Sequence, residues 1–223
     1  MSSAARALGL AEVDALLRAE GRYAVGRGMV PAARLLLVLA AAGFAFGAVM
    51  GSFGGRPAQA LFSALKVPIL LVFSTAVCLP NFCAVNAVLG LQDDLRAALR
   101  GVLASQTTVA VALCALAPLD LVAYASGVSY RSAVLANGVL FALAALAGQR
   151  TLARHYAPLI AANPRHRVAR AAWLALYVFV AIQLAWVLRP FVGWPDFRSS
   201  FLREDAWSNA YVIVLRDVLG IRW

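Results

Sequence analysis

The chain has 223 residues, of which 63% are hydrophobic and 13% are charged, and it carries a formal net charge of +10. Typical soluble domains are about 45–50% apolar and about 25% charged, so this composition excludes an ordinary soluble domain and indicates a membrane protein. The charge does not indicate a nucleic-acid partner, because the basic residues flank apolar segments instead of forming one exposed basic module. Anionic lipid headgroups are the expected partners of these basic residues.

The first part of the chain, residues 1–33, mixes charged with apolar residues, so no cleavable signal peptide is predicted. Within it, Leu10, Val13 and Leu17 share one face of a helix predicted over residues 5–18. We expect this amphipathic segment to be cytoplasmic and to lie on the membrane or on a partner protein.

Five apolar runs follow, and each is close to the roughly 20 residues that a helix needs to cross a bilayer. The runs are Leu35–Phe53, Leu65–Leu91, Gly101–Ala125, Ser132–Leu152 and Ala171–Leu188. They lack the polar–apolar alternation of a membrane β-barrel, so helices are predicted. The expected fold is a single all-α integral membrane domain, with a five-span bundle over residues 34–189 and an interfacial tail over residues 190–223.

The distribution of basic residues predicts the orientation of the bundle, because cytoplasmic loops carry the excess of lysine and arginine. The segment before the first span and the 2–3 and 4–5 connections contain five, two and five arginines. The opposite loops contain only Arg56, Lys66 and Arg131. The N-terminus is therefore expected in the cytoplasm, and with five spans the C-terminus is expected in the periplasm.

The first span has a packing pattern, with Gly43, Gly47 and Gly51 spaced four residues apart. Such a glycine stripe lets a second helix approach closely in a membrane. The partner helix can belong to this bundle or to another subunit.

The second span contains Pro80 and Asn81 near its middle, and we expect a kink or an opening there, because proline removes one helical hydrogen bond. The amide of Asn86 is expected to bond across the bundle to Gln106, Thr107 or Asn137 and so to fix the register of the helices. The alternative is that the broken span lines a transport path. The absence of an acidic residue from the middle of every predicted span disfavours this alternative.

The connection between the fourth and fifth spans, residues 150–170, is predicted to be a basic loop that contacts lipid phosphates or an acidic partner. Its candidate contact residues are Arg154, Arg165, Arg167 and Arg170. His155 and His166 lie in the same stretch, and we expect them to be in solvent and not to bind a metal.

No catalytic pattern is present, since the sequence contains no GxSxG, no HExxH and no phosphate-binding glycine loop. Asp93 and Asp94 are expected to cap the short helix DDLRAALR. Cys78, Cys83 and Cys114 lie inside predicted spans and are expected to act as small buried hydrophobic residues. We therefore predict no enzymatic activity, no cofactor and no metal.

After the fifth span, Arg189 is expected to reach the headgroups, and Pro190 is expected to end the helix. The apolar stretch Tyr211–Leu219 is too short for an ordinary span. An interfacial helix is expected there, and a short sixth or re-entrant span over residues 209–221 is the alternative.

Two segments, LKVPILLVFSTAVCLPNFCAVNAVLG and WVLRPFVGWPDFRSSFLRED, resemble the paired signatures of a family of small multispan bacterial inner-membrane proteins. The first carries K-x-P with a later proline and asparagine, and the second carries L-R-P-F-x-G-x-P. The matching positions are Lys66, Pro68, Pro80, Asn81, Asn86, Arg189, Pro190, Phe191, Gly193 and Pro195. The resemblance implies the multispan topology and a bacterial inner membrane, and it assigns no activity.

From these observations we expect a non-catalytic subunit or scaffold of a larger membrane assembly, with other membrane subunits or further copies of itself as partners. The alternative function is a small transporter or channel with its path at the second span, near Pro80. A lipid-handling enzyme is a more distant alternative.

Overall fold

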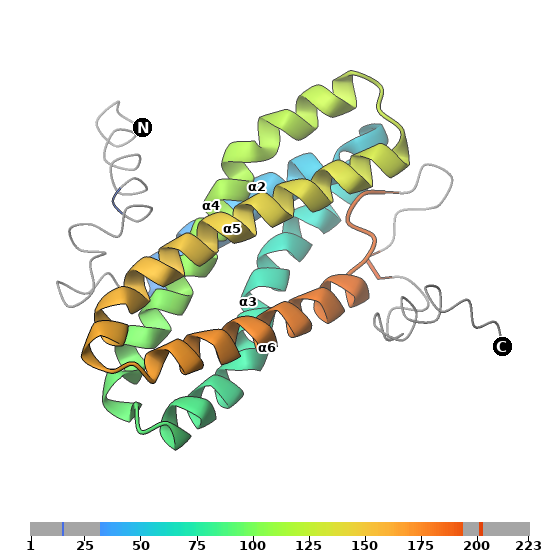
Figure 1. Cartoon of the computed structure of the whole chain (residues 1–223). Helices are drawn as coiled ribbons and strands as arrows, with labels where there is room; N and C mark the ends of the chain where they lie inside the picture. The colour runs from blue at the N-terminus through green and yellow to red at the C-terminus, as the bar shows by residue number, and fades with distance from the viewer. Residues whose placement is uncertain (1–14, 16–31, 194–200, 203–223) are drawn as a thin grey trace, which may run out of the picture.

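The structure is a computed structural model that describes residue 15, residues 32–193 and residues 201–202. The expected N-terminal helix, Pro195 and the C-terminal apolar stretch lie outside these residues. Five long α-helices are present in the described part (Figure 1): α2 (Ala32–Gly51), α3 (Pro57–Val88), α4 (Leu95–Ala125), α5 (Tyr130–Ala162) and α6 (His166–Val187). Two short 3₁₀ turns, η2 (Phe53–Gly55) and η3 (Gln92–Asp94), lie in the connections.

All five long helices have the length and the apolar composition needed to cross a membrane. The predicted all-α, multi-pass membrane bundle is therefore confirmed. Consecutive helices run in opposite directions, so that α3 and α5 begin, and α2, α4 and α6 end, at one end of the bundle. We call this the Arg189 end, and we call the opposite end, where α5 meets α6, the His166 end.

The helices extend beyond the predicted spans, and the prediction of a long basic loop over residues 150–170 is wrong. α5 continues to Ala162 and α6 begins at His166, so the connection between them is only three residues long. Hydropathy marks the part of a helix that lies in hydrocarbon, whereas arginine is a good helix former outside it. With 33 residues, α5 is about 50 Å long, well beyond the roughly 30 Å of hydrocarbon.

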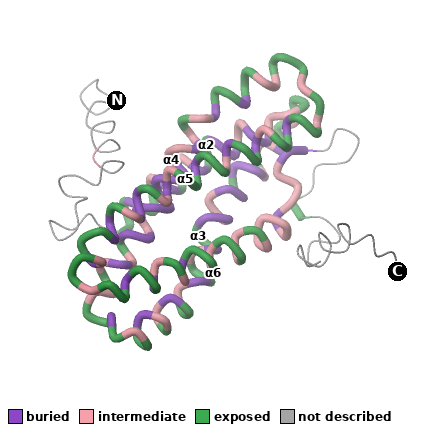
Figure 2. The backbone as a smooth tube through the Cα atoms, in the orientation of Figure 1, coloured by how far each residue is buried: buried purple, intermediate pink, exposed green. Residues whose placement is uncertain are grey.

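The helices pack unevenly. α2 lies against α3 and α4, α5 lies along α4, and α6 packs mainly against α3. α5 and α6 meet at their short connection and then diverge toward the Arg189 end, with few contacts between them (Figure 1). The fully buried residues of α6 are His166, Ala169 and Trp173, all in its first third (Figure 2). The second half of α6 therefore packs loosely on the bundle.

The glycines of α2 lie against α3. A Cβ atom added to Gly51 would lie 2.6 Å from the carbonyl oxygen of Gln59, and one added to Gly47 would clash with the backbone of Ser63 and Ala64. At Gly43 the added atom would be 3.4 Å from Pro68, which is an ordinary contact distance. The backbones of α2 and α3 thus approach most closely at the two later glycines, inside this bundle.

Helix α3 does not open at Pro80, so of the kink or opening expected there the opening is absent. It is α-helical from Pro57 to Val88. Pro68 and Pro80 each remove one hydrogen bond and leave the rest of the 32-residue helix bonded. Pro80 and Asn81 lie on its exposed surface and face away from the core.

The expected cross-bundle bond of Asn86 is also absent. Its side-chain nitrogen donates within α3 to the carbonyl of Phe82 at 2.8 Å, and its side-chain oxygen has no partner in the described part of the chain. Polar bonds between helices are made instead by other residues. Tyr177 in α6 donates to Gln106 in α4 at 2.7 Å, and Asn137 in α5 donates to the Tyr124 hydroxyl at 2.8 Å.

Candidate functional site

Three polar side chains lie along one face of α3, near the Arg189 end. Gln59, Ser63 and Lys66 follow the spacing that places residues on one side of a helix, and all three are fully buried. All three donate hydrogen bonds to the backbone of the segment that follows α6. We call these three donors, together with residues 189–193, the strap cluster.

The bonds of the strap cluster converge on two carbonyl groups. The Lys66 ammonium donates to the carbonyl of Pro190 at 2.6 Å. The Gln59 amide donates to the carbonyls of Pro190 and Phe191, both at 3.0 Å, and the Ser63 hydroxyl donates to the carbonyl of Phe191. Each carbonyl therefore has two donors.

The local sequence explains why this segment needs donors. α6 ends at Val187, and the chain then runs in a non-helical path across α3 through a cis Arg189–Pro190 peptide. Buried non-helical backbone must find hydrogen-bond partners inside the protein, because it lacks both the helical bonds and the bonds that water would make. Gly193 closes the cluster, since a Cβ atom there would lie 2.9 Å from the Gln59 side chain.

Lys66 is fully buried within α3, so its assignment to a loop is wrong. Its ammonium lies 5.8 Å from the ring centroid of Phe191 and 5.2 Å from that of Phe201. Both distances are within the range of cation–π attraction. Among the described residues no carboxylate pairs with this ammonium. A carbonyl dipole and two aromatic rings offset its desolvation instead.

The strap cluster thus brings part of the first signature into contact with the second. Lys66 contacts Pro190 and Phe191 directly, and Pro68 lies two residues farther along α3, against α2. The other positions of the first signature are not in the cluster, because Pro80, Asn81 and Asn86 lie more than three turns beyond Lys66 on the same helix.

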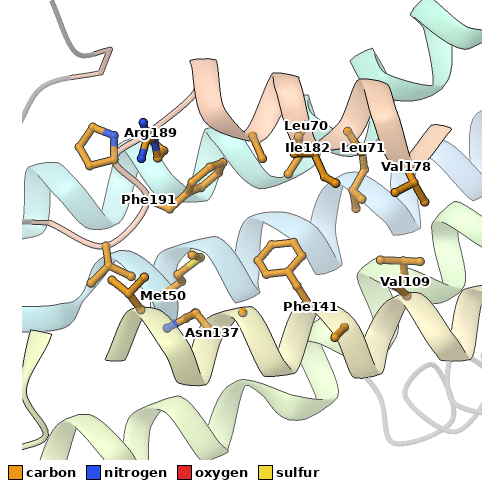
Figure 3. A pocket seen from close by; sticks show the side chains of 18 of the residues that line it. Met50, Leu70, Leu71, Val109, Asn137, Phe141, Val178, Ile182, Arg189 and Phe191 are labelled. Carbon is orange, nitrogen blue, oxygen red and sulfur yellow. The ribbon is translucent and has the colours of Figure 1, made fainter. Parts of the chain in front are cut away.

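A cavity of about 1500 Å³ lies beside the strap cluster, between the diverging helices α5 and α6 (Figure 3). α3 and α4 form its floor, and Arg189, Phe191 and Asn137 lie at one end of it, with Val109 and Val178 toward the other. Most of its lining is aliphatic or aromatic. The cavity was not predicted from the sequence, because no single helix shows the divergence of two others.

Several polar groups at the cavity wall are already bonded to the protein. Ser105 donates to the carbonyl of Gly148 at 2.9 Å, and Gln106 accepts from Tyr177. Gln59 and Asn137 each retain a side-chain oxygen without a hydrogen-bond partner in the described part of the chain. Apart from these groups, Tyr130, Gln149 and the arginines at one end, the wall presents an apolar surface.

No protein-family model matches the chain, and no curated protein or solved structure matches it either. The strap cluster and the cavity therefore carry the functional inference.

The histidines at the His166 end are buried, so the expectation that they lie in solvent is wrong. His166 is fully buried, and its Nε2 lies 3.0 Å from a carboxylate oxygen of Asp94. Asp94 makes no side-chain capping bond to its own helix, contrary to the expectation. His155 is also buried, and its Nδ1 lies 3.0 Å from the carbonyl of Thr151. The short α5–α6 turn places the His166 ring against the bundle, and His155 lies on the buried face of α5.

The candidate contact arginines lie near this same end. Arg154, Arg165 and Arg167 are exposed, and Arg170 is half-buried. Arg165 also donates to the carbonyl of Leu89 at 3.3 Å, which ties the α5–α6 turn to the end of α3. The four arginines therefore lie around the end of α5 and the start of α6, and not in a long loop.

The remaining histidine, cysteine and acidic side chains of the described residues form no metal-binding group. In residues 32–193 and the other described positions, no three histidine, cysteine or acidic residues are grouped to hold a metal. The three cysteines are free thiols; Cys78 is buried in an apolar cluster with Phe82 and Trp173. The His166–Asp94 pair links two connections, and the other ring contact of His166 is with Tyr156.

Proposed function

We propose that this chain is a non-catalytic, multi-pass subunit or scaffold of a larger assembly in a bacterial inner membrane. The observation that carries the proposal is the strap cluster. Three buried donors of α3, one of them charged, are used to hold a short backbone segment in one place. These hydrogen bonds hold the segment after α6 in one position and so fix the shape of the Arg189 end. The three donors are bonded to the protein itself.

The orientation is part of the same proposal. The exposed Arg154, Arg165 and Arg167 at the His166 end favour a cytoplasmic location for that end, by the positive-inside rule. The Arg189 end and the C-terminus are then periplasmic. The basic His166 end would contact anionic headgroups or an acidic partner, and the strap cluster would present its surface to a second subunit.

The alternative of a transport path at Pro80 gains no support from the cavity. Pro80 and Asn81 lie on the exposed side of α3, and neither they nor Asn86 line the cavity between α5 and α6. The uninterrupted helix also offers no unwound backbone that could bind an ion.

The test compares complexes isolated in mild detergent from native membranes, using the full tagged chain. We expect a stoichiometric partner with the unaltered chain and with Val139→Ala, an exposed position on α5 that serves as control. The double variant Gln59→Leu/Lys66→Met, which removes both donors to Pro190, should lose the partner while the chain stays in the membrane. A solitary chain that carries a solute across liposomes would overturn the proposal.

A further inference from the structure

The cavity between α5 and α6 opens sideways, at the depth of the membrane. Val134 on α5 and Val178 and Ile182 on α6 line it, yet they are 42%, 45% and 49% exposed. A side chain that both lines a cavity and is exposed marks its mouth. Because the mouth lies on membrane-spanning helices, it faces hydrocarbon, and a lipid chain can enter without crossing a polar barrier.

The dimensions of the cavity match a membrane lipid. Along α6 its lining extends from Tyr177 to Ala185, which is about 12 Å at 1.5 Å per residue, and strap residues 189–193 continue it. One leaflet contributes about 15 Å of the hydrocarbon thickness. The volume of about 1500 Å³ also exceeds the roughly 300–1,000 Å³ of ordinary small-molecule pockets. A two-chain amphiphile fits these dimensions better than a compact polar solute.

The charged groups of the cavity lie at the Arg189 end, whereas Ser105, Gln106 and Gln149 lie toward the other end. Arg56 and Arg189 both belong to the lining there, and no aspartate or glutamate does. Each guanidinium has five N–H donors in a fork that matches a phosphate, so contacts within the protein still leave donors for a ligand.

We propose that this cavity is a binding site for an anionic phospholipid. Its phosphate lies between Arg56 and Arg189, and its chains lie along the apolar walls of α5 and α6. The occupant is a lipid and not a helix of another protein, because the cavity pairs a cationic end with an apolar length and a lateral mouth. This inference does not depend on the proposed scaffold function, since a scaffold or a carrier could equally hold such a lipid.

The structure offers variants that fill the cavity without disturbing the bundle. Gly138 on α5 lines the cavity, and a Cβ atom added there would meet no atom within 4 Å. Gly138→Leu should therefore fold at least as well, because leucine is a better helix former than glycine. Ala145→Phe fills the cavity from a second exposed lining position. Val139→Phe is the matched control, since Val139 is 57% exposed on α5 and outside the lining.

Native mass spectrometry of the full chain in detergent measures the bound lipid. We expect the unaltered chain and Val139→Phe to retain phosphatidylglycerol, and the two filling variants to lose it. Adding phosphatidylglycerol should raise the Tm of the unaltered chain more than phosphatidylcholine does, and inorganic phosphate should not raise it. Arg56→Gln should weaken phosphatidylglycerol binding about ten-fold, the effect of losing one charged hydrogen bond.

Three results would overturn the proposal. One is retention of the lipid by both filling variants, and another is equal loss from the Val139→Phe control, which would indicate lipid on the outer surface. The third is loss of a copurifying protein, instead of lipid, from the filling variants, because a partner helix would then be the occupant. Loss of the partner in the Gln59→Leu/Lys66→Met test bears only on the scaffold proposal, so the two can fail separately.

Discussion

The ammonium of Lys66 lies 2.6 Å from the carbonyl oxygen of Pro190, a residue 124 positions later in the chain. This bond joins the first third of α3 to the segment that leaves α6. It matters for the fold because the second half of α6 contains no fully buried residue. The loosely packed end of α6 is thus held by polar bonds at its terminus, and the position of that terminus shapes one end of the cavity.

Because each strap carbonyl has two donors, the effects of two substitutions on the free energy of unfolding should be coupled in a specific way. Gln59→Leu or Lys66→Met alone leaves each carbonyl at least one donor, but the double variant leaves the Pro190 carbonyl none. The double variant should therefore lose about 1–2 kcal/mol more than the sum of the single effects, the penalty of an unsatisfied buried group. Thermal unfolding in detergent measures the loss of stability in the two single variants and the double variant.

The matched control for this coupling is Ser63→Ala/Lys66→Met. In that pair Gln59 still donates to both carbonyls, so the two effects should add to within about 0.5 kcal/mol. Equal coupling in both double variants would contradict the assignment of two donors to each carbonyl.

The glycines of α2 give a second prediction, in which neighbouring positions differ. Gly47→Ala and Gly51→Ala should each destabilise the bundle by about 1–3 kcal/mol, because the new methyl group meets the backbone of α3. Gly43→Ala should be neutral or stabilising, since its methyl group would be 3.4 Å from Pro68 and alanine favours the helix. Unfolding midpoints in detergent rank the stability of the three variants. An equal loss of stability in all three would contradict a close helix contact confined to Gly47 and Gly51.

The sequence predicts well which segments form spans, but it predicts poorly which residues contact one another, for physical reasons. An apolar run of about 20 residues is a local property, so the five helices follow from it directly. The partner of Lys66 depends on where α6 ends in space, which no local pattern records. The resemblance drew attention to Lys66 and Pro190, but it did not place them in contact.

The errors at the His166 end have the same origin. Residues 150–170 are rich in arginine, and polarity alone does not separate a loop from a helix that projects beyond the hydrocarbon. Because α5 continues as a helix, His155 takes a fixed position on its buried face. His166 meets Asp94 only because a three-residue turn folds α6 back on the bundle. The cavity was missed for a related reason, since its walls come from all five long helices of the described part and from the segment after α6.

The His166–Asp94 pair predicts unequal effects of removing its two members. Asp94 is 44% exposed, so Asp94→Ala should cost only about 1 kcal/mol, the contribution of one hydrogen bond. His166→Ala should cost more, because the fully buried ring also packs edge-on against Tyr156 at 6.1 Å. Unfolding midpoints of the two variants test this order, and a larger loss for Asp94→Ala would show that charge dominates over packing.

The unequal packing of α6 gives the final prediction. Trp173 is 2% exposed and packs edge-on against Phe82 at 5.2 Å, whereas Ile182 is 49% exposed at the mouth of the cavity. Trp173→Ala should destabilise the bundle by about 3 kcal/mol, the low end of the range for large core residues, because lipid can partly replace the lost contacts. Ile182→Ala should cost less than about 1 kcal/mol. Similar losses at both positions would mean that α6 is packed evenly along its length, and the cavity would then have no room for a lipid.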